Sequence, residues 1–323
     1  MIRESRERTP AVTTSVGVAA RDAIPLVGAG LLPSGTRISI GHLGDETTAE
    51  RLAAVHAVLD ADLIPVPHLA ARRFPSRAAL DLFLRDLERA GAGEDVFVIG
   101  GDPMRPAGPY TDAMSLLTSP EFRSHGVRSV GIGGHPEGHP RIGDTVLWRA
   151  LEEKTEWLGS IGLRCTVITQ LSTDPAAVLA WIADARRRGI RLPFSVGLPG
   201  PLPDDALVDY PQRDHDPERS SAPLATPALE RVAPPADFVE RLLARLDPAQ
   251  HGVVELHVFG LGDPVDTARA LRTTWSQRSA ERTRAVDDAE RRTALGAGRR
   301  DGPGDHTRRE KRPDLDRRMS ARA

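Results

Sequence analysis

The feature that most constrains this chain is a regular alternation between short runs rich in β-branched residues and longer amphipathic stretches. Eight runs have the length and composition of buried strands: 12–20, 37–42, 63–70, 95–102, 129–135, 165–171, 193–199 and 253–260. This alternation is typical of parallel βα units, in which each strand returns to the sheet through a helix. Eight successive units favour a closed (β/α)8 TIM barrel over an open sheet, because an open sheet needs a switch in strand order that no sequence pattern reveals.

The stretches between these runs carry helix signals of their own. Thr47 and Glu50 form a capping box that predicts the start of one helix, and Asp174-Pro175 predicts the start of another. Helical spacing predicts three core-facing stripes: Leu52, Val55 and Leu59; Leu80, Phe83, Leu84 and Leu87; Val178, Trp181, Ile182 and Ala185. The exception is 201–234, whose proline and charge density predicts an irregular segment after strand seven.

Composition bounds the class of protein. With 323 residues, 40% hydrophobic residues and a formal charge of −2, the chain can bury a large core and has no bulk electrostatic reason to bind nucleic acid or a membrane. The single cysteine, Cys165, excludes an internal disulfide, and its apolar surroundings indicate a buried strand residue rather than a nucleophile.

The two ends of the chain differ from its middle. We expect a flexible N-terminus at 1–11, the barrel at 12–275, and a charged, disordered tail at 276–323 that lacks the apolar residues needed for packing. A solvated tail is the favoured interpretation, and a nucleic-acid role is the alternative. The N-terminus is polar and no apolar run reaches the length of a membrane span, so we expect a cytoplasmic protein.

Polar residues follow most of the predicted strands. In barrels of this kind the active site is built at the carboxyl ends of the strands. The residues expected there are Ser39, His42, His68, Asp102, His135, Glu137, His139, Gln170 and His257. One histidine at a strand end is usually structural, but a set of polar residues converging on one face favours a functional site.

The stretch GIGGHPEGHP at 131–140 invites three interpretations. As a zinc motif it fails, because Pro136 and Pro140 exclude the helix that would bring His135 and His139 to one face. As a dinucleotide fingerprint it fails on glycine spacing. It is therefore either a structural turn or a strand end whose glycines let a large ligand approach the backbone.

Four motifs resemble one known family when taken together. In order and spacing, VPHLAARR at 66–73, GGDP at 100–103, HPEGHP at 135–140 and ITQ at 168–170 are similar to the short bacterial members of the methylenetetrahydrofolate reductase family. The resemblance covers roughly 12–275. It implies a barrel containing FAD, in which NADH or NADPH reduces the flavin. The flavin then passes hydride to 5,10-methylenetetrahydrofolate and yields 5-methyltetrahydrofolate, in one-carbon and methionine metabolism.

The resemblance also implies roles for particular residues. Asp102 would lie near the flavin and stabilise the cationic iminium form of the folate, and Gln170 would hydrogen-bond the pterin ring. The residues implied to hold FAD are Ser39, His68, Gly101, Asp102, Tyr110, His135, His139 and Lys154. Lys154 follows Leu147 by seven residues and is expected on the inner side of its helix, the alternative being a solvated lysine. We expect a folate-type small-molecule substrate and no metal, and we leave a homo-oligomer open.

Three departures from the family pattern open other interpretations. Gly100 stands where the family has an arginine, His135 stands where it has an aromatic residue, and Gly17 stands where its first strand carries a glutamate general acid. The irregular 201–234 segment also replaces a helix that carries a stacking aromatic. A second hypothesis is therefore a flavin- or folate-binding relative with weak or no reductase activity. A third is a metal-dependent hydrolase that uses His68, His135, His139, His257 and Asp102.

Overall fold

The computed structural model describes residues 14–201 and 235–272. The predicted N-terminus at 1–11 and tail at 276–323 lie outside these residues. So does the predicted irregular segment at 201–234, apart from its first residue. The predicted domain boundaries therefore stay predictions.

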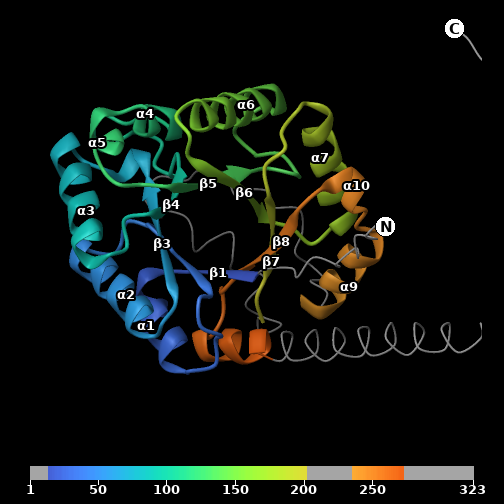
Figure 1. The fold of residues 1–323 in the computed structure, drawn as a ribbon, viewed down its shortest axis with the longest axis horizontal. Coiled ribbons are helices and arrows are strands. Elements are labelled where there is room, and N and C mark those ends of the chain that lie inside the picture. Colours follow the sequence, from blue (N-terminus) through green and yellow to red (C-terminus); the bar gives the residue numbers. More distant parts are fainter. Residues whose placement is uncertain (1–13, 202–234, 273–323) are drawn as a thin grey trace, which may run out of the picture. The chain divides into compact units, whose positions relative to one another are not determined.

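The described strands form a closed parallel barrel in which each strand pairs with the next in the chain and the last pairs with the first. Figure 1 shows the helices surrounding these central strands. The strands are β1 (Thr14–Val18), β2 (Arg37–Ile40), β3 (Ile64–Ala70), β4 (Asp95–Ile99), β5 (Ser129–Gly134), β6 (Arg164–Leu171), β7 (Phe194–Pro199) and β8 (Val254–Phe259). The predicted (β/α)8 barrel and its eight strand positions are confirmed.

Helices connect the strands in the order expected for βα units. They are α1 (Ala20–Gly28), α2 (Thr48–Asp60), α3 (Arg77–Ala90), α4 (Ala113–Leu117), α5 (Pro120–Arg123), α6 (Asp144–Ser160), α7 (Pro175–Arg187), α9 (Pro235–Arg245) and α10 (Pro248–His251), with a 3-10 turn at Ala71–Arg73 and helical residues at 264–272. Within the described residues, no helix combines the length and apolarity needed to cross a membrane.

The predicted helix starts are confirmed in atomic detail. In the capping box of α2, the Glu50 amide donates to the Thr47 hydroxyl at 3.2 Å, and the Thr47 amide donates to the Glu50 carboxylate at 2.7 Å. At the start of α7, the Ala176 amide donates to the Asp174 carboxylate at 2.9 Å.

The layer between helices and strands holds most of the apolar core. The predicted stripe of α3 is buried throughout, and so is that of α7 except for Trp181, which is half-buried and stacks on Trp148 at 5.1 Å between ring centroids. Cys165 is buried and faces this layer, and burial raises the pKa of its thiol to about 12. The prediction of a buried, unreactive thiol agrees with this environment.

The predicted core stripe of α2 is wrong in two of its three positions. Val55 is buried, but Leu52 and Leu59 are only half-buried. The helix is rotated because Arg51 turns inward, where its guanidinium donates to the carbonyl of His68 and lies 4.0 Å from the ring centroid of Phe83. The helix buries Arg51, Ala54, Val55 and Val58 in place of the predicted set.

Inside the barrel, Phe97 packs in a small apolar cluster with Val66, Ile168 and Ile99, and a second ring, Phe259, lies near the carboxyl end. Bulky branched side chains usually fill such interiors. Here an added Cβ at Gly131 would lie 2.7 Å from the ring of Phe97, and one at Gly197 would lie 2.6 Å from the ring of Phe259. Glycines on neighbouring strands therefore make room for the two rings.

Candidate functional site at the barrel mouth

The loops after β3 and β4 meet at the carboxyl end of the barrel. The Nη2 atom of Arg73 lies 3.7 Å from Oδ2 of Asp102, whose side chain is 56% exposed. Gly101 precedes this aspartate with φ of +87°, a conformation that strongly favours glycine, and an added Cβ would lie 3.3 Å from the Cβ of Ala70. Because β4 ends at Ile99 rather than at the predicted 102, Asp102 belongs to a loop that aims its carboxylate at solvent.

The loop after β5 places two imidazoles beside this carboxylate. The rings of His135 and His139 lie 5.7 Å apart, centroid to centroid, and both side chains are half-buried. Burial lowers the pKa of His135 to about 4, and burial followed by the charge of Arg141 lowers the pKa of His139, against the opposing charge of Asp102. The imidazole of His135 is therefore neutral near pH 7. The guanidinium of Arg141 contacts the sulfur of Met104 at 3.1 Å and so joins this loop to the one after β4.

Lys154 stands behind this loop on α6. It is half-buried on the same helix face as the buried residues Leu151 and Leu158, as the spacing from Leu147 predicts. Burial lowers the pKa of its ammonium group, although the charge of Asp112 opposes the shift. The charge of Lys154 in turn contributes to the low pKa of His135, so the ammonium group lies close enough to the imidazole to disfavour its protonation.

Gln170 lies near the carboxyl end of β6, the strand next to β5, at a break in strand pairing. The register between β6 and β7 shifts between Ile168 and Leu171, and irregularities of this kind re-aim side chains at barrel rims. Gln170 is exposed there. Two residues on, the hydroxyl of Ser172 donates to the carboxylate of Glu137, which ties the loop after β6 to the loop after β5.

Other predicted site residues lie inside the barrel. His257 is 1% exposed, its Nδ1 lies 2.8 Å from the Ser15 hydroxyl, and burial lowers its pKa to about 4. His68 packs edge-on against Phe97 at 4.6 Å, burial lowers its pKa to about 3, and its buried Nε2 has no hydrogen-bond partner. Ser39 is buried on β2, between Gly17 of β1 and Val66 of β3.

Two further predicted residues are held by contacts with neighbouring residues. Tyr110 is 3% exposed and its hydroxyl donates to Glu121 of the outer helix α5 at 3.1 Å. His42 follows β2 and accepts the amide of Ala70 at 3.4 Å while its ring packs edge-on against Phe74. The structure therefore brings Asp102, His135, His139 and Lys154 together, places Gln170 at the end of the neighbouring strand β6, and does not bring Tyr110 into this group.

The hydrolase hypothesis needs five residues to act as one ligand set. His68 and His257 lie within the barrel, whereas His135, His139 and Asp102 lie in loops at its rim. In the part of the chain that the structure describes, no group of three or more His, Cys, Asp and Glu side chains is placed to hold a metal ion. Residues 131–134 belong to β5, and 135–140 form turns with a short bridge between His139 and Ile142. The stretch forms no helix, as its prolines predict.

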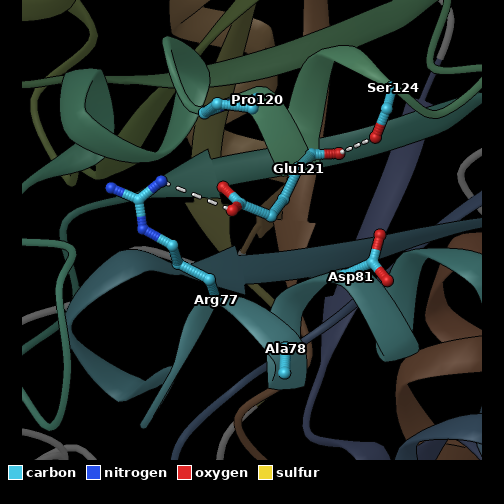
Figure 2. Close-up of a pocket in the computed structure, with 6 residues that line it drawn as sticks. All are labelled: Arg77, Ala78, Asp81, Pro120, Glu121 and Ser124. Carbon is cyan, nitrogen blue, oxygen red and sulfur yellow. Dashed lines mark hydrogen bonds and ion pairs between the residues drawn. The ribbon is translucent and has the colours of Figure 1, made fainter.

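A separate cleft of about 380 Å³ opens on the outer face of the barrel between α3 and α5 (Figure 2). Its lining residues are Arg77, Ala78, Asp81, Pro120, Glu121 and Ser124. The guanidinium of Arg77 lies 3.5 Å from the carboxylate of Glu121 across this cleft. None of the residues predicted for the site lines it, so we place the candidate site at the barrel mouth.

Three residues of the mouth have no role that the sequence alone predicts. Arg73 ends the VPHLAARR motif, and Arg141 directly follows the HPEGHP motif. Their partners, Asp102 for Arg73 and Met104 for Arg141, are in another loop and are known only from the folded structure. Phe259 ends β8, and its sequence context indicates only a strand residue. The glycines beside its ring, Gly17 and Gly197, are far from it in the sequence, so no local sequence pattern predicts this packing.

Comparison with known proteins yields distant likenesses in fold and no family. No protein-family model matches the chain. A crystal structure of dihydropteroate synthase (FolP) from Thermus thermophilus is 15% identical, over 83% of this chain and 94% of that one, with a TM-score of 0.43. The same enzyme in complex with 6HMPPP is 14% identical, over 84% and 96%, with a TM-score of 0.44. Likenesses this distant say nothing about the site.

Proposed function

We propose that this chain is a flavin-dependent oxidoreductase related to the methylenetetrahydrofolate reductase family. In this proposal it reduces 5,10-methylenetetrahydrofolate to 5-methyltetrahydrofolate with NADH or NADPH. The observation that carries the proposal is the assembly at the barrel mouth, where an exposed carboxylate, Asp102, lies beside a cluster of cationic and imidazole groups. The motifs that resemble the family supply most of these side chains.

The residues present fit FAD as a cofactor. A diphosphate needs cationic and hydrogen-bonding donors, and Arg73, His135, His139 and Lys154 supply them around one part of the rim. The backbone there is also open, because an added Cβ at Gly100 would meet no atom within 4 Å. These four side chains would hold the diphosphate. When bound, FAD would supply hydride transfer between the nicotinamide and the folate.

Asp102 and Gln170 have the chemistry for the folate. The carboxylate of Asp102 is 56% exposed and its ion pair with Arg73 is long, at 3.7 Å, so it can also accept a positively charged iminium group. The exposed carboxamide of Gln170 offers both a donor and an acceptor to the edge of a pterin ring.

One observation favours a second function, binding of flavin or folate with little reduction. An added Cβ at Gly17 would lie 2.6 Å from Nε2 of His257, so the imidazole fills the space that an acidic side chain on β1 would need. A positioned general acid contributes about 10² to 10⁴ in rate. Without one at this position, reduction of the folate is expected to be slow.

Two measurements separate these functions. The purified full-length protein is first incubated with FAD and desalted, and retention of a visible flavin spectrum is the expected result. Anaerobic NADH or NADPH should then bleach the flavin, and methylenetetrahydrofolate should restore its colour. If the protein retains FAD and NADH or NADPH bleaches it, but methylenetetrahydrofolate does not restore the colour, the second function, binding with little reduction, is supported. Protein that takes up no FAD overturns the flavin assignment in both.

A further inference from the structure

The end of β8 places an aromatic ring at the mouth, opposite the charged loops. Phe259 follows Glu255 and His257 at alternate positions of the strand, which share one side. That side faces the barrel interior, because the Phe259 ring lies 3.7 Å from a Cβ built on Gly17 of β1 and 2.6 Å from one built on Gly197 of β7. The side chain is half-buried, so part of the ring remains open at the carboxyl end of the barrel.

The neighbouring strands are shaped around this ring. Gly197 cannot carry a side chain without displacing it, and Gly17 leaves room on the other flank. From below, the imidazole of His257 packs edge-on against it, with centroids 4.7 Å apart and planes at 82°. Contact with the β7 backbone at Gly197 and with the His257 imidazole restricts the ring, which reduces the entropy that a ligand must remove on binding.

A hydrogen-bonding edge lies next to the ring. The Cβ built on Gly197 is within 2.7 Å of both the Phe259 ring and the backbone oxygen of Gln170. The backbone of Gln170 therefore lies beside the ring, at the β6 irregularity, and the residue is exposed there. An aromatic face beside a carboxamide is suited to a planar ring whose edge carries both donors and acceptors.

We propose that Phe259 is a stacking platform for a planar nitrogen heterocycle with an amide edge, which Gln170 reads. The inference rests on the proposed function, in which isoalloxazine, pterin and nicotinamide rings all share this chemistry. It goes beyond that function because neither the family motifs nor the segment after β7 supplies this residue.

The test compares the binding of three probes to the full-length protein: FAD, 5-methyltetrahydrofolate and NADH. Dissociation constants are measured by fluorescence titration for the parent, Phe259→Leu and Phe259→Tyr. Because stacking on an aromatic side chain contributes about a tenfold factor or more in affinity, Phe259→Leu should weaken at least one probe about tenfold. Phe259→Tyr should retain it. The probe that weakens identifies the ring that stacks.

Phe122→Leu is the control, since it makes the same change at a buried phenylalanine of α5, on the outer side of the barrel. It should bind all three probes like the parent. If Phe259→Leu does not fold, Phe259→Met keeps a long apolar side chain and takes its place. Gln170→Ala should weaken the same probe as Phe259→Leu, which a merely structural role for Phe259 would not produce.

The outcomes separate this inference from the proposed function. If the parent binds FAD and Phe259→Leu binds every probe within twofold of the parent, the platform is overturned and the function stands. If the parent binds 5-methyltetrahydrofolate or NADH but no FAD, the flavin function is overturned and the same comparison still decides the platform. A parent that binds none of the probes overturns both.

Discussion

A methyl group added at Gly17 is predicted to destabilise the protein, because the imidazole of His257 occupies the space. The built Cβ lies 2.6 Å from Nε2 and 3.2 Å from Cε1 of that ring. The ring is not free to withdraw, since Nδ1 lies 2.8 Å from the Ser15 hydroxyl and the ring meets Phe259 at 4.7 Å. Relief of the contact must therefore come from the hydrogen bond, the aromatic contact or the backbone.

The expected magnitude follows from these contacts. Overpacking a well-filled core costs about 1–3 kcal/mol, and a hydrogen bond lost in the process costs about 1 kcal/mol. We therefore expect Gly17→Ala to lower the free energy of unfolding by about 2 kcal/mol. For a domain of this size such a loss lowers the melting temperature by roughly 4–8 °C.

The assay is a double-mutant cycle in which urea denaturation gives the free energy of unfolding of each variant. Gly17→Ala, His257→Ala and the double variant are compared with the parent, and the double variant should be more stable than the sum of the two losses by about 1–2 kcal/mol. Gly159→Ala serves as the control. Its Cβ would meet no neighbouring atom within 4 Å on helix α6, so this change should be neutral or stabilising.

Additive losses in the two single variants, within about 0.5 kcal/mol, would refute the reasoning by showing that the ring does not oppose the methyl group. The same contact bears on catalysis. An acid introduced by Gly17→Glu alone should displace the ring rather than reach the substrate. Gly17→Glu combined with His257→Ala should speed the folate half-reaction and leave reduction of the flavin by NADH nearly unchanged.

Three further predictions concern other parts of the barrel. Asp102→Asn should slow folate reduction more than flavin reduction in stopped-flow measurements, because in the proposed function its charge stabilises the iminium group. Arg186→Met should lower the free energy of unfolding by about 3 kcal/mol, since the buried guanidinium donates to three backbone carbonyls at 2.7–2.9 Å. Burial opposes charging of His125, but bonds from its ring to two carboxylates at 2.9 and 3.0 Å outweigh this and raise its pKa. His125→Gln should therefore lower the free energy of unfolding by its full amount below about pH 6.5. This difference from the parent should disappear as pH rises through the raised pKa.

Each of these predictions has its own contradicting result. Equal slowing of both half-reactions would remove Asp102 from its role. Arg187→Met is the control for Arg186→Met, since Arg187 is exposed and pairs only loosely with Asp184 at 3.4 Å, and equal losses in the two variants would contradict the role of the buried carbonyl contacts. For His125, a stability difference that is constant from about pH 5 to about pH 9 would show that its charge does not contribute.

The barrel could be predicted from the sequence because its signals are local. Alternating strand and helix patterns, the Thr47–Glu50 capping box and the apolar stripe of α3 each depend on residues a few positions apart, and all are confirmed. The prediction fails at α2, where a buried arginine bonded to the carbonyl of His68 rotates the helix. A polar partner 17 residues away leaves no trace in the periodicity of α2 itself.

The site was less predictable because its geometry comes from closure of the barrel. Strand-end residues such as Asp102 and Gln170 could be named from their positions and motifs, but loop direction decides which of them face the mouth. Tyr110, for example, turns outward to Glu121. The proximity of His257 to Gly17 depends on pairing between the last and first strands, and no local pattern encodes it.

That closure also sets the order in which the mouth is completed. The hydrogen bond between Ser15 and His257 joins residues 242 positions apart, so the seam between β1 and β8 forms only after almost the whole barrel has been synthesised. On a ribosome, a nascent chain that has not reached Val254 already contains Arg73, Asp102 and the histidines of the charged rim. Phe259, on the aromatic side of the mouth, belongs to the last strand. A ligand that stacks on it would therefore stabilise only chains whose barrel has closed.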